Sequence, residues 1–159
     1  MIKTPELFPT GYHLYPFQLD PIVNTWVQQE AWAEVEKYFE RLTKPGGAIF
    51  SMLQEFHAFS QIEIMISIRD GSNAWEEDGI WHDDGSRVFA FSLSLTISPE
   101  TLEGGSLELR MKNDSHSMII PTPPFGTGIL FLTGIHGFEH RTRAVRSGRR
   151  IILVGWCLA

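Results

Sequence analysis

The chain has 159 residues, of which 43% are hydrophobic and 20% are charged, and its formal net charge at pH 7 is −6. A chain of this length is expected to fold as one domain around its own hydrophobic core. The acidic balance argues against a nonspecific nucleic-acid binder, because such a protein needs a basic face to neutralise phosphates.

Cysteine usage and hydropathy bear on localisation. Cys157 is the only cysteine, so no disulfide can form within the chain and a reducing compartment is expected. The first residues lack the apolar region of a secretory signal, and no apolar run approaches the roughly 18 to 20 residues that cross a bilayer. We therefore expect a cytoplasmic protein without a membrane partner.

The first part of the sequence predicts helical structure. Asp20 is a suitable N-cap and Pro21 a suitable first helical residue. Apolar side chains then recur mostly three or four residues apart as far as Leu42, which is typical of an amphipathic helix. The Lys-Pro-Gly-Gly sequence of residues 44–47 ends this pattern. We predict one long helix between Asp20 and residue 44.

From about residue 60 the period of the pattern changes to two, which is typical of β-strands. In 61–68 four isoleucines share one face, and in 88–98 one face is large and apolar while the other is small and partly polar. That second face either leaves room for a cavity or meets solvent. Further strand-like runs are 106–111, 117–121, 128–132 and 149–158.

These patterns predict the fold class. We expect residues 1–159 to form a single, mainly β domain with helices, an α+β arrangement. It has a helical front over about residues 1–59 and a β core over about residues 60–158. Antiparallel strands in this number favour a sandwich or jelly roll with the N-terminal helices packed on one sheet.

The sharpest local feature is the sequence Trp81-His82-Asp83-Asp84-Gly85. On an extended strand His82 and Asp84 point the same way, and an imidazole beside a carboxylate can chelate a divalent metal. A His-x-Asp pair by itself is weak evidence, because it arises often by chance. Asp83 has the opposite parity and is expected to face solvent or to support the ligands.

A second feature lies near the C-terminus, where His140 precedes several arginines. In the last strand Arg150 shares a face with Ile152, Val154 and Trp156. If this face lines the interior, the guanidinium needs an anion, either an internal acid or a ligand carboxylate. The alternative is a surface arginine at the start of a strand. With a distant His140, His82 and Asp84 would complete a two-His-one-carboxylate metal site.

On these residues the sequence resembles the prolyl 4-hydroxylase-like branch of the 2-oxoglutarate/iron(II) oxygenases. Proteins of this branch carry His-x-Asp, a distal His and an Arg ten residues beyond it, positions held here by His82, Asp84, His140 and Arg150. Residues 103–107 and 124–131 resemble the Gly-Gly hairpin and the segment before the distal His. His136 is the competing histidine, but only His140 stands ten residues before Arg150.

The resemblance implies a double-stranded β-helix, a cupin-like jelly roll, that binds Fe(II) and 2-oxoglutarate as cosubstrate, with ascorbate as a candidate reductant. It implies a dioxygenase that hydroxylates a substrate while 2-oxoglutarate is oxidatively decarboxylated to succinate and CO2. Arg150 would bind the far carboxylate of 2-oxoglutarate. Many relatives also use a tyrosine whose place is taken here by Ser94, with Ser92 as another donor.

The sequence does not identify the substrate. We expect a small molecule or a peptide, and we consider a nucleic acid a less favoured substrate. Trp75, Trp81 and Trp156 are candidate substrate contacts, the first two in a loop over residues 69–81 that is either a lid or an exposed connector. The basic cluster around Arg143 and Arg146 either attracts an anionic substrate or forms a solvated hairpin. Alternative functions are a cupin-like metal- or ligand-binding protein without oxygenase activity and a non-catalytic β-sandwich interaction module.

Overall fold

The computed structural model describes residues 11–72, 75, 78–135 and 137–159. It is mainly β, with antiparallel sheets and three short α-helices near the start of the chain. The helices are α2 (Ile22–Gln28), α3 (Trp32–Thr43) and α4 (Ala48–Gln54). None of the helices in the described ranges has the length and apolar character that crossing a bilayer requires.

The predicted single long helix is wrong, because the segment forms two helices separated at residues 29–31. Glu30 adopts a left-handed conformation with φ of 57°. The N–H of Ala31 donates to the carbonyl of Trp26, and that of Glu30 to the carbonyl of Val27. This pair of hydrogen bonds is the Schellman arrangement that ends helices. Helical periodicity alone did not reveal it. The N-cap position of α2 is held by Pro21 and not by Asp20 as predicted, although Asp20 Oδ1 accepts the N–H of Ile22 over 3.0 Å just before the helix.

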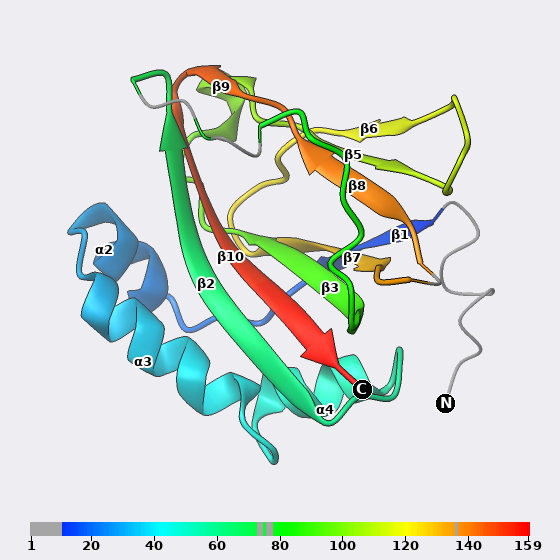
Figure 1. Cartoon of the computed structure of the whole chain (residues 1–159). Coiled ribbons are helices and arrows are strands. Elements are labelled where there is room, and N and C mark those ends of the chain that lie inside the picture. The colour runs from blue at the N-terminus through cyan, green and yellow to red at the C-terminus, as the bar shows by residue number, and fades with distance from the viewer. Residues whose placement is uncertain (1–10, 73–74, 76–77, 136) are drawn as a thin grey trace.

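A five-stranded antiparallel sheet forms the centre of the domain (Figure 1). In spatial order its strands are β1 (Tyr12–Pro16), β7 (Thr127–Leu132), β3 (Arg87–Ser94), β10 (Arg149–Leu158) and β2 (Gln61–Asp70). The helices lie against one side of this sheet, and the smaller sheets lie across its other side. This sheet therefore separates a helical layer from a second β layer.

The second layer consists of short strands. A three-stranded sheet has the order β6 (Met118–Ile120), β5 (Leu107–Arg110) and β8 (Glu139–Thr142), and β4 (Glu103–Gly104) pairs with β9 (Val145–Ser147). A short 3-10 helix, η1 (Pro99–Thr101), precedes β4. Each predicted strand run contains a strand of the structure. The short strands β1, β4, β8 and β9 were not predicted, because two to five residues carry too little periodicity.

The core has two parts, one on each side of the large sheet. Phe89, Phe91 and Leu93 from β3 pack with the helices. Ala90 from the opposite face of β3 packs with the smaller strands. Gly155 on β10 leaves space for the ring of Phe91, because a Cβ at position 155 would lie 2.0 Å from that ring. The predicted division of β3 into a bulky face and a small face is therefore observed, and the small face lies between the two β layers.

Candidate metal centre and anion cavity

His82 and His140 are brought together by backbone pairing. The N–H of each donates to the carbonyl of the other, over 3.0 and 2.9 Å, in an isolated antiparallel bridge at the end of the small sheet. Their imidazole centroids lie 4.2 Å apart with the rings at 60°. Phe131 of β7 packs its edge against His140, with 5.0 Å between the ring centroids. Two histidines from distant parts of the chain thus share one small space.

Asp84 reaches the same space by a route that the alternation argument did not predict. It adopts a left-handed conformation with φ of 62°, so His82 and Asp84 do not lie on one extended strand. The turn is held by Asp83, whose Oδ1 accepts the N–H of Gly85 over 2.9 Å and whose carbonyl accepts the N–H of Gly134. The two side chains converge because of this turn.

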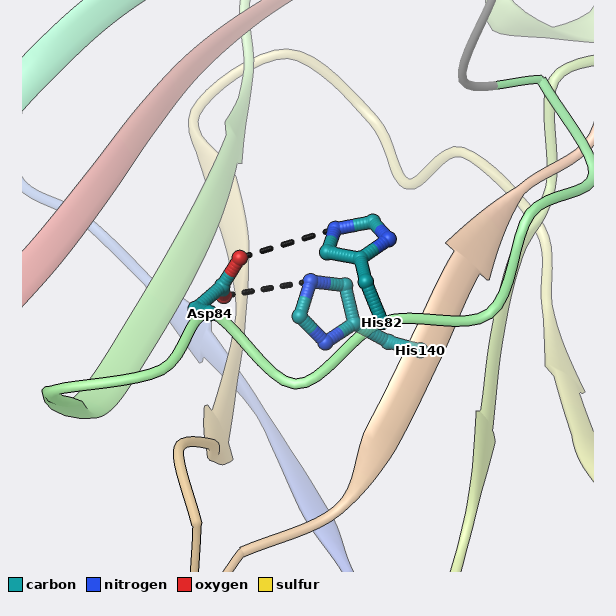
Figure 2. Close-up of side chains that lie close together, drawn as sticks. All are labelled: His82, Asp84 and His140. Carbon is teal, nitrogen blue, oxygen red and sulfur yellow. Dashed lines mark ion pairs between the residues drawn. The ribbon is translucent and has the colours of Figure 1, made fainter.

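The three side chains offer ligand atoms that all lie within 4.8 Å of one another. His140 Nε2 lies 3.2 Å from Asp84 Oδ2, and His82 Nε2 lies 3.5 Å from Asp84 Oδ1. Figure 2 shows both imidazole rings directed at the carboxylate. The side chains of Asp84 and His140 are 7% and 8% exposed, whereas that of His82 is 44% exposed. The cluster is therefore open to solvent on the His82 side.

Neighbouring groups orient these three side chains. His82 Nδ1 lies 3.1 Å from the carbonyl of Ile80 and donates to it, which leaves the lone pair of Nε2 facing Asp84. The Thr133 hydroxyl lies 3.1 Å from Asp84 Oδ2 and 2.8 Å from the carbonyl of Asp83. Two nitrogens and a carboxylate in this arrangement fit a divalent first-row transition metal.

The charge state of Asp84 suits such a metal. Burial by itself would raise the pKa of the Asp84 carboxyl, but contacts with His140, His82 and Thr133 outweigh burial and hold the pKa below its ordinary value. The carboxyl is therefore ionised at neutral pH. Asp83, by contrast, pairs with Lys112 over 2.8 Å and is not one of the three clustered ligand residues.

A cavity of about 120 Å³ lies beside His82 and His140, between the two β layers. A buried water needs roughly 10–15 Å³ on this scale, so the cavity has room for a small organic molecule. Ser92 of β3 and Trp156 and Arg150 of β10 line it. The small face of β3 thus borders a cavity rather than solvent.

Arg150 is buried in this cavity and forms no ion pair with a described residue. It is 4% exposed, and no oxygen in the described part of the chain accepts a hydrogen bond from its guanidinium. Gly105 makes room for the side chain, since a Cβ there would lie 2.9 Å from Arg150 Cδ. Burial and repulsion from Arg69 outweigh the attraction of Asp78 and lower the pKa of Arg150 to about 9, so the side chain stays cationic at neutral pH.

Arg69 is a second buried cation, opposite Arg150 in the pairing of β2 with β10. Its Nη1 lies 2.7 Å from Asp78 Oδ1, and its guanidinium lies 4.3 Å from the ring of Trp75. Unlike Arg150, it therefore has a counter-ion within the chain. Arg69 was not singled out from the sequence, although its odd parity on 61–70 would have placed it on the cavity face.

The other residues expected at the site fall into different places. Trp156 lines the cavity, Trp75 lies against Arg69, and Trp81 lies between the guanidinium groups of Arg110 and Arg141, 4.1 and 4.4 Å from them. Ser92 lines the cavity, whereas Ser94 is fully buried and its Oγ accepts the N–H of Thr96. The competing His136 lies outside the described residues.

The basic cluster after His140 was expected either to attract an anionic substrate or to form a solvated hairpin, and the structure differs from both. Arg141 and Arg143 both pair with Glu108, an acid whose side chain is 1% exposed, and the Ser117 hydroxyl donates to the same carboxylate over 3.1 Å. Burial would raise the pKa of Glu108, but these donors outweigh burial and lower it. Arg146 remains an exposed side chain on β9.

No family model matches the sequence, and no curated protein matches it significantly. Solved structures do resemble the fold. A prolyl-4-hydroxylase from Pseudomonas putida has a TM-score of 0.64 and 14% identity, over 98% of this chain and 92% of that one. A prolyl hydroxylase from Trichoplax adhaerens has a TM-score of 0.63 and 14% identity, over 98% of this chain and 87% of that one.

A viral collagen prolyl hydroxylase from Paramecium Bursaria Chlorella virus-1 is also similar, with a TM-score of 0.56 and 14% identity over 96% of this chain and 92% of that one. At these identities the likeness concerns the fold. It extends over nearly the whole of this chain and nearly the whole of each neighbour. The chain therefore has the fold of these prolyl hydroxylases.

Proposed function

We propose that the chain is an Fe(II)- and 2-oxoglutarate-dependent dioxygenase in which residues 1–159 act as a single domain built as a double-stranded β-helix. One observation carries the proposal: the cavity that contains the unpaired, buried Arg150 is also lined by His82 and His140, two of the three converging ligand side chains. A ligand with a carboxylate at its far end would satisfy Arg150 while its other end reaches the metal.

The charges of the cavity support a dianionic ligand. Arg150 and Arg69 contribute two positive charges, and Asp78 and Asp84 contribute two negative charges. A divalent cation held by the triad would then leave two positive charges in a space largely shielded from water. A dicarboxylate restores neutrality there, and burial makes this balance energetically important.

In the proposed reaction 2-oxoglutarate, dioxygen and a substrate C–H give succinate, CO2 and a substrate C–OH. Fe(II) would supply the activation of dioxygen when bound. His82, Asp84 and His140 would hold the metal, and Arg150 would bind and orient the cosubstrate. The substrate would approach on the open side, where His82 and Trp156 line the cavity. The Trichoplax neighbour was solved with a peptide fragment, and a peptide or a small molecule is the proposed substrate class here.

The test is anaerobic titration with Fe(II) and 2-oxoglutarate, followed by the visible metal-to-ligand charge-transfer absorption. We expect the band with the wild-type protein, its loss in His140→Ala, and its retention in His116→Ala, a matched control because the His116 side chain is 93% exposed. Succinate formed after oxygen is admitted would demonstrate turnover. Metal binding without the band would favour the cupin-like alternative and reject the oxygenase.

A further inference from the structure

Ser67, on the cavity face of β2, has a buried hydroxyl group without a partner. The residue is 2% exposed, and its Oγ makes no hydrogen bond within the described part of the chain. Buried hydroxyl groups nearly always have a partner, because losing water without compensation is unfavourable. Ser67 lines the same cavity as Arg150, so a ligand in that cavity is the available acceptor.

The register of the large sheet places Ser67 beside Arg150. Ser67 lies opposite Ile152 of β10, and Arg150 lies opposite Arg69. Ser67 and Arg150 are therefore diagonal neighbours on one face, a relation that puts residues roughly 7–8 Å apart and within reach of a long side chain. A carboxylate bound by the guanidinium would lie close to the hydroxyl.

Ser94 provides a contrast within the same row of the sheet. It lies opposite Ile152 from the other side, in the pairing of β3 with β10, and it also faces away from the helices. Its Oγ already accepts the N–H of Thr96, and its side chain is fully buried. Ser92 lines the cavity but lies opposite Val154, one row further from Arg150. Among the three serines, Ser67 alone combines an unpartnered hydroxyl with a position diagonal to Arg150.

We propose that Ser67 determines specificity for a dicarboxylic cosubstrate by donating its hydroxyl hydrogen to the carboxylate that Arg150 binds. The assignment rests on the proposed function. Ser67 stands on the strand before the metal ligands, and the nearby Arg69–Asp78 pair keeps the second guanidinium in place at the same end of the cavity. The carboxylate thus receives one donor from β2 and a charged fork from β10.

The experiment compares Ser67→Ala with the matched control Ser51→Ala, which makes the same change at an exposed position on α4. Each is loaded with Fe(II) without oxygen and titrated with 2-oxoglutarate and, separately, with 2-oxobutyrate, which lacks the far carboxylate. We expect Ser67→Ala to weaken 2-oxoglutarate binding roughly 10-fold or more, with Fe(II) and 2-oxobutyrate affinities unchanged. Ser51→Ala is expected to bind both ligands like the wild type, and Ser67→Thr to recover most of the loss.

Two outcomes would overturn the assignment while leaving the proposed function intact. One is a Ser67→Ala protein that binds 2-oxoglutarate as the wild type does. The other is an equal loss for 2-oxoglutarate and 2-oxobutyrate, which would indicate a general disturbance of the cavity. Absence of the charge-transfer band from the wild type with either ligand is a different result, because it rejects the oxygenase function and this role of Ser67 with it.

Discussion

Two buried charged clusters lie in the two halves of the β structure, and they differ in how their charges are satisfied. In the small sheet the carboxylate of Glu108 receives hydrogen bonds from Arg141, Arg143 and Ser117. In the cavity Arg150 is 4% exposed and has no acceptor within the described residues. Both are strongly buried ionised groups, yet among the described residues only the first has directly hydrogen-bonded partners.

This difference indicates that the Glu108 cluster is structural and that Arg150 belongs to a binding site. A buried charge costs several kcal/mol unless it is paired. The Glu108 cluster meets that requirement internally, so it has no need of a ligand and links β5 to β8. Arg150 does not form a direct pair with any described residue, and Asp78, which attracts it, is already paired with Arg69. An anionic ligand would therefore give Arg150 the direct partner that the described chain does not supply. A buried charged group without a hydrogen-bonding partner therefore indicates the binding site more clearly than a high local density of charged residues does.

The largest expected effect follows from removing the unsatisfied cation. Arg150→Met should weaken 2-oxoglutarate binding at least about 100-fold, because truncating one side of a buried charged pair costs roughly 2–5 kcal/mol. Stability of the ligand-free protein should stay the same or rise by about 1–2 kcal/mol, because an apolar side chain replaces an unpaired charge. Ligand titration and urea unfolding measure the two quantities.

The exposed Arg146 supplies the control for this prediction. Arg146→Met makes the same chemical change on β9 and should alter neither ligand affinity nor stability by more than about 0.5 kcal/mol. A ligand-free Arg150→Met protein that is clearly less stable than wild type would show that Arg150 has a structural partner, and the contrast between the clusters would fail.

The satisfied cluster should respond in the opposite way. Glu108→Gln keeps the size of the side chain but leaves Arg141 and Arg143 without their counter-charge, and we expect a loss of about 2 kcal/mol in the free energy of unfolding. The cost is below that of a fully buried pair because these arginine side chains are 25% and 52% exposed. Affinity for 2-oxoglutarate should stay within about twofold of wild type, since the change is remote from Arg150.

Asp78 provides a further test, because it neutralises one of the two cavity arginines. Asp78→Asn removes a negative charge beside Arg69 and should lower stability by about 2 kcal/mol, somewhat less than for a fully buried pair because each side chain is still 10% exposed. The more positive cavity should bind 2-oxoglutarate a few-fold more tightly. A weaker affinity in this variant would mean that the ion pair holds Arg69 in a position that the ligand requires.

The smallest effect is a difference in acid stability. The folded pKa of Glu108 lies below its ordinary value of 4.5, so the unfolded chain takes up the proton first as pH falls. The stabilisation by ionised Glu108 is thus complete above about pH 5 and is lost as pH falls through the folded pKa. Urea unfolding should show that the difference in free energy of unfolding between wild type and Glu108→Gln narrows from pH 7 to pH 4. If both proteins lose the same free energy of unfolding over this range, ionised Glu108 does not stabilise the fold.

Much of the site could be predicted from short-range pattern. Alternation on 149–158 placed Arg150 on the face of Ile152, Val154 and Trp156, and the structure has these side chains on one face of β10. Spacing also selected His82, Asp84 and His140, which converge within 4.8 Å. The alternation argument for His82 and Asp84 was nevertheless wrong, because Asp84 lies in a left-handed turn held by Asp83.

Other features depend on partners that are distant in the sequence. The helix break at Glu30 is a local event that periodicity does not detect, since an apolar pattern can continue across it. The roles of Ser67 and Ser94 look interchangeable in the sequence, because both are small polar residues on alternating strands. They differ in the structure because the Oγ of Ser94 accepts the N–H of Thr96, while the Oγ of Ser67 makes no hydrogen bond within the described residues.

The sequence by itself thus determined which side of β10 Arg150 occupies, because successive side chains of a strand point to opposite faces whatever surrounds them. The tertiary structure alone decided that Glu108 pairs with Arg141 and Arg143 while Arg150, beside Ser67, forms no ion pair with any residue that the structure describes. Whether a buried charge is satisfied depends on which strands come to lie opposite it. That pairing is set by the packing of the whole domain and not by any local pattern.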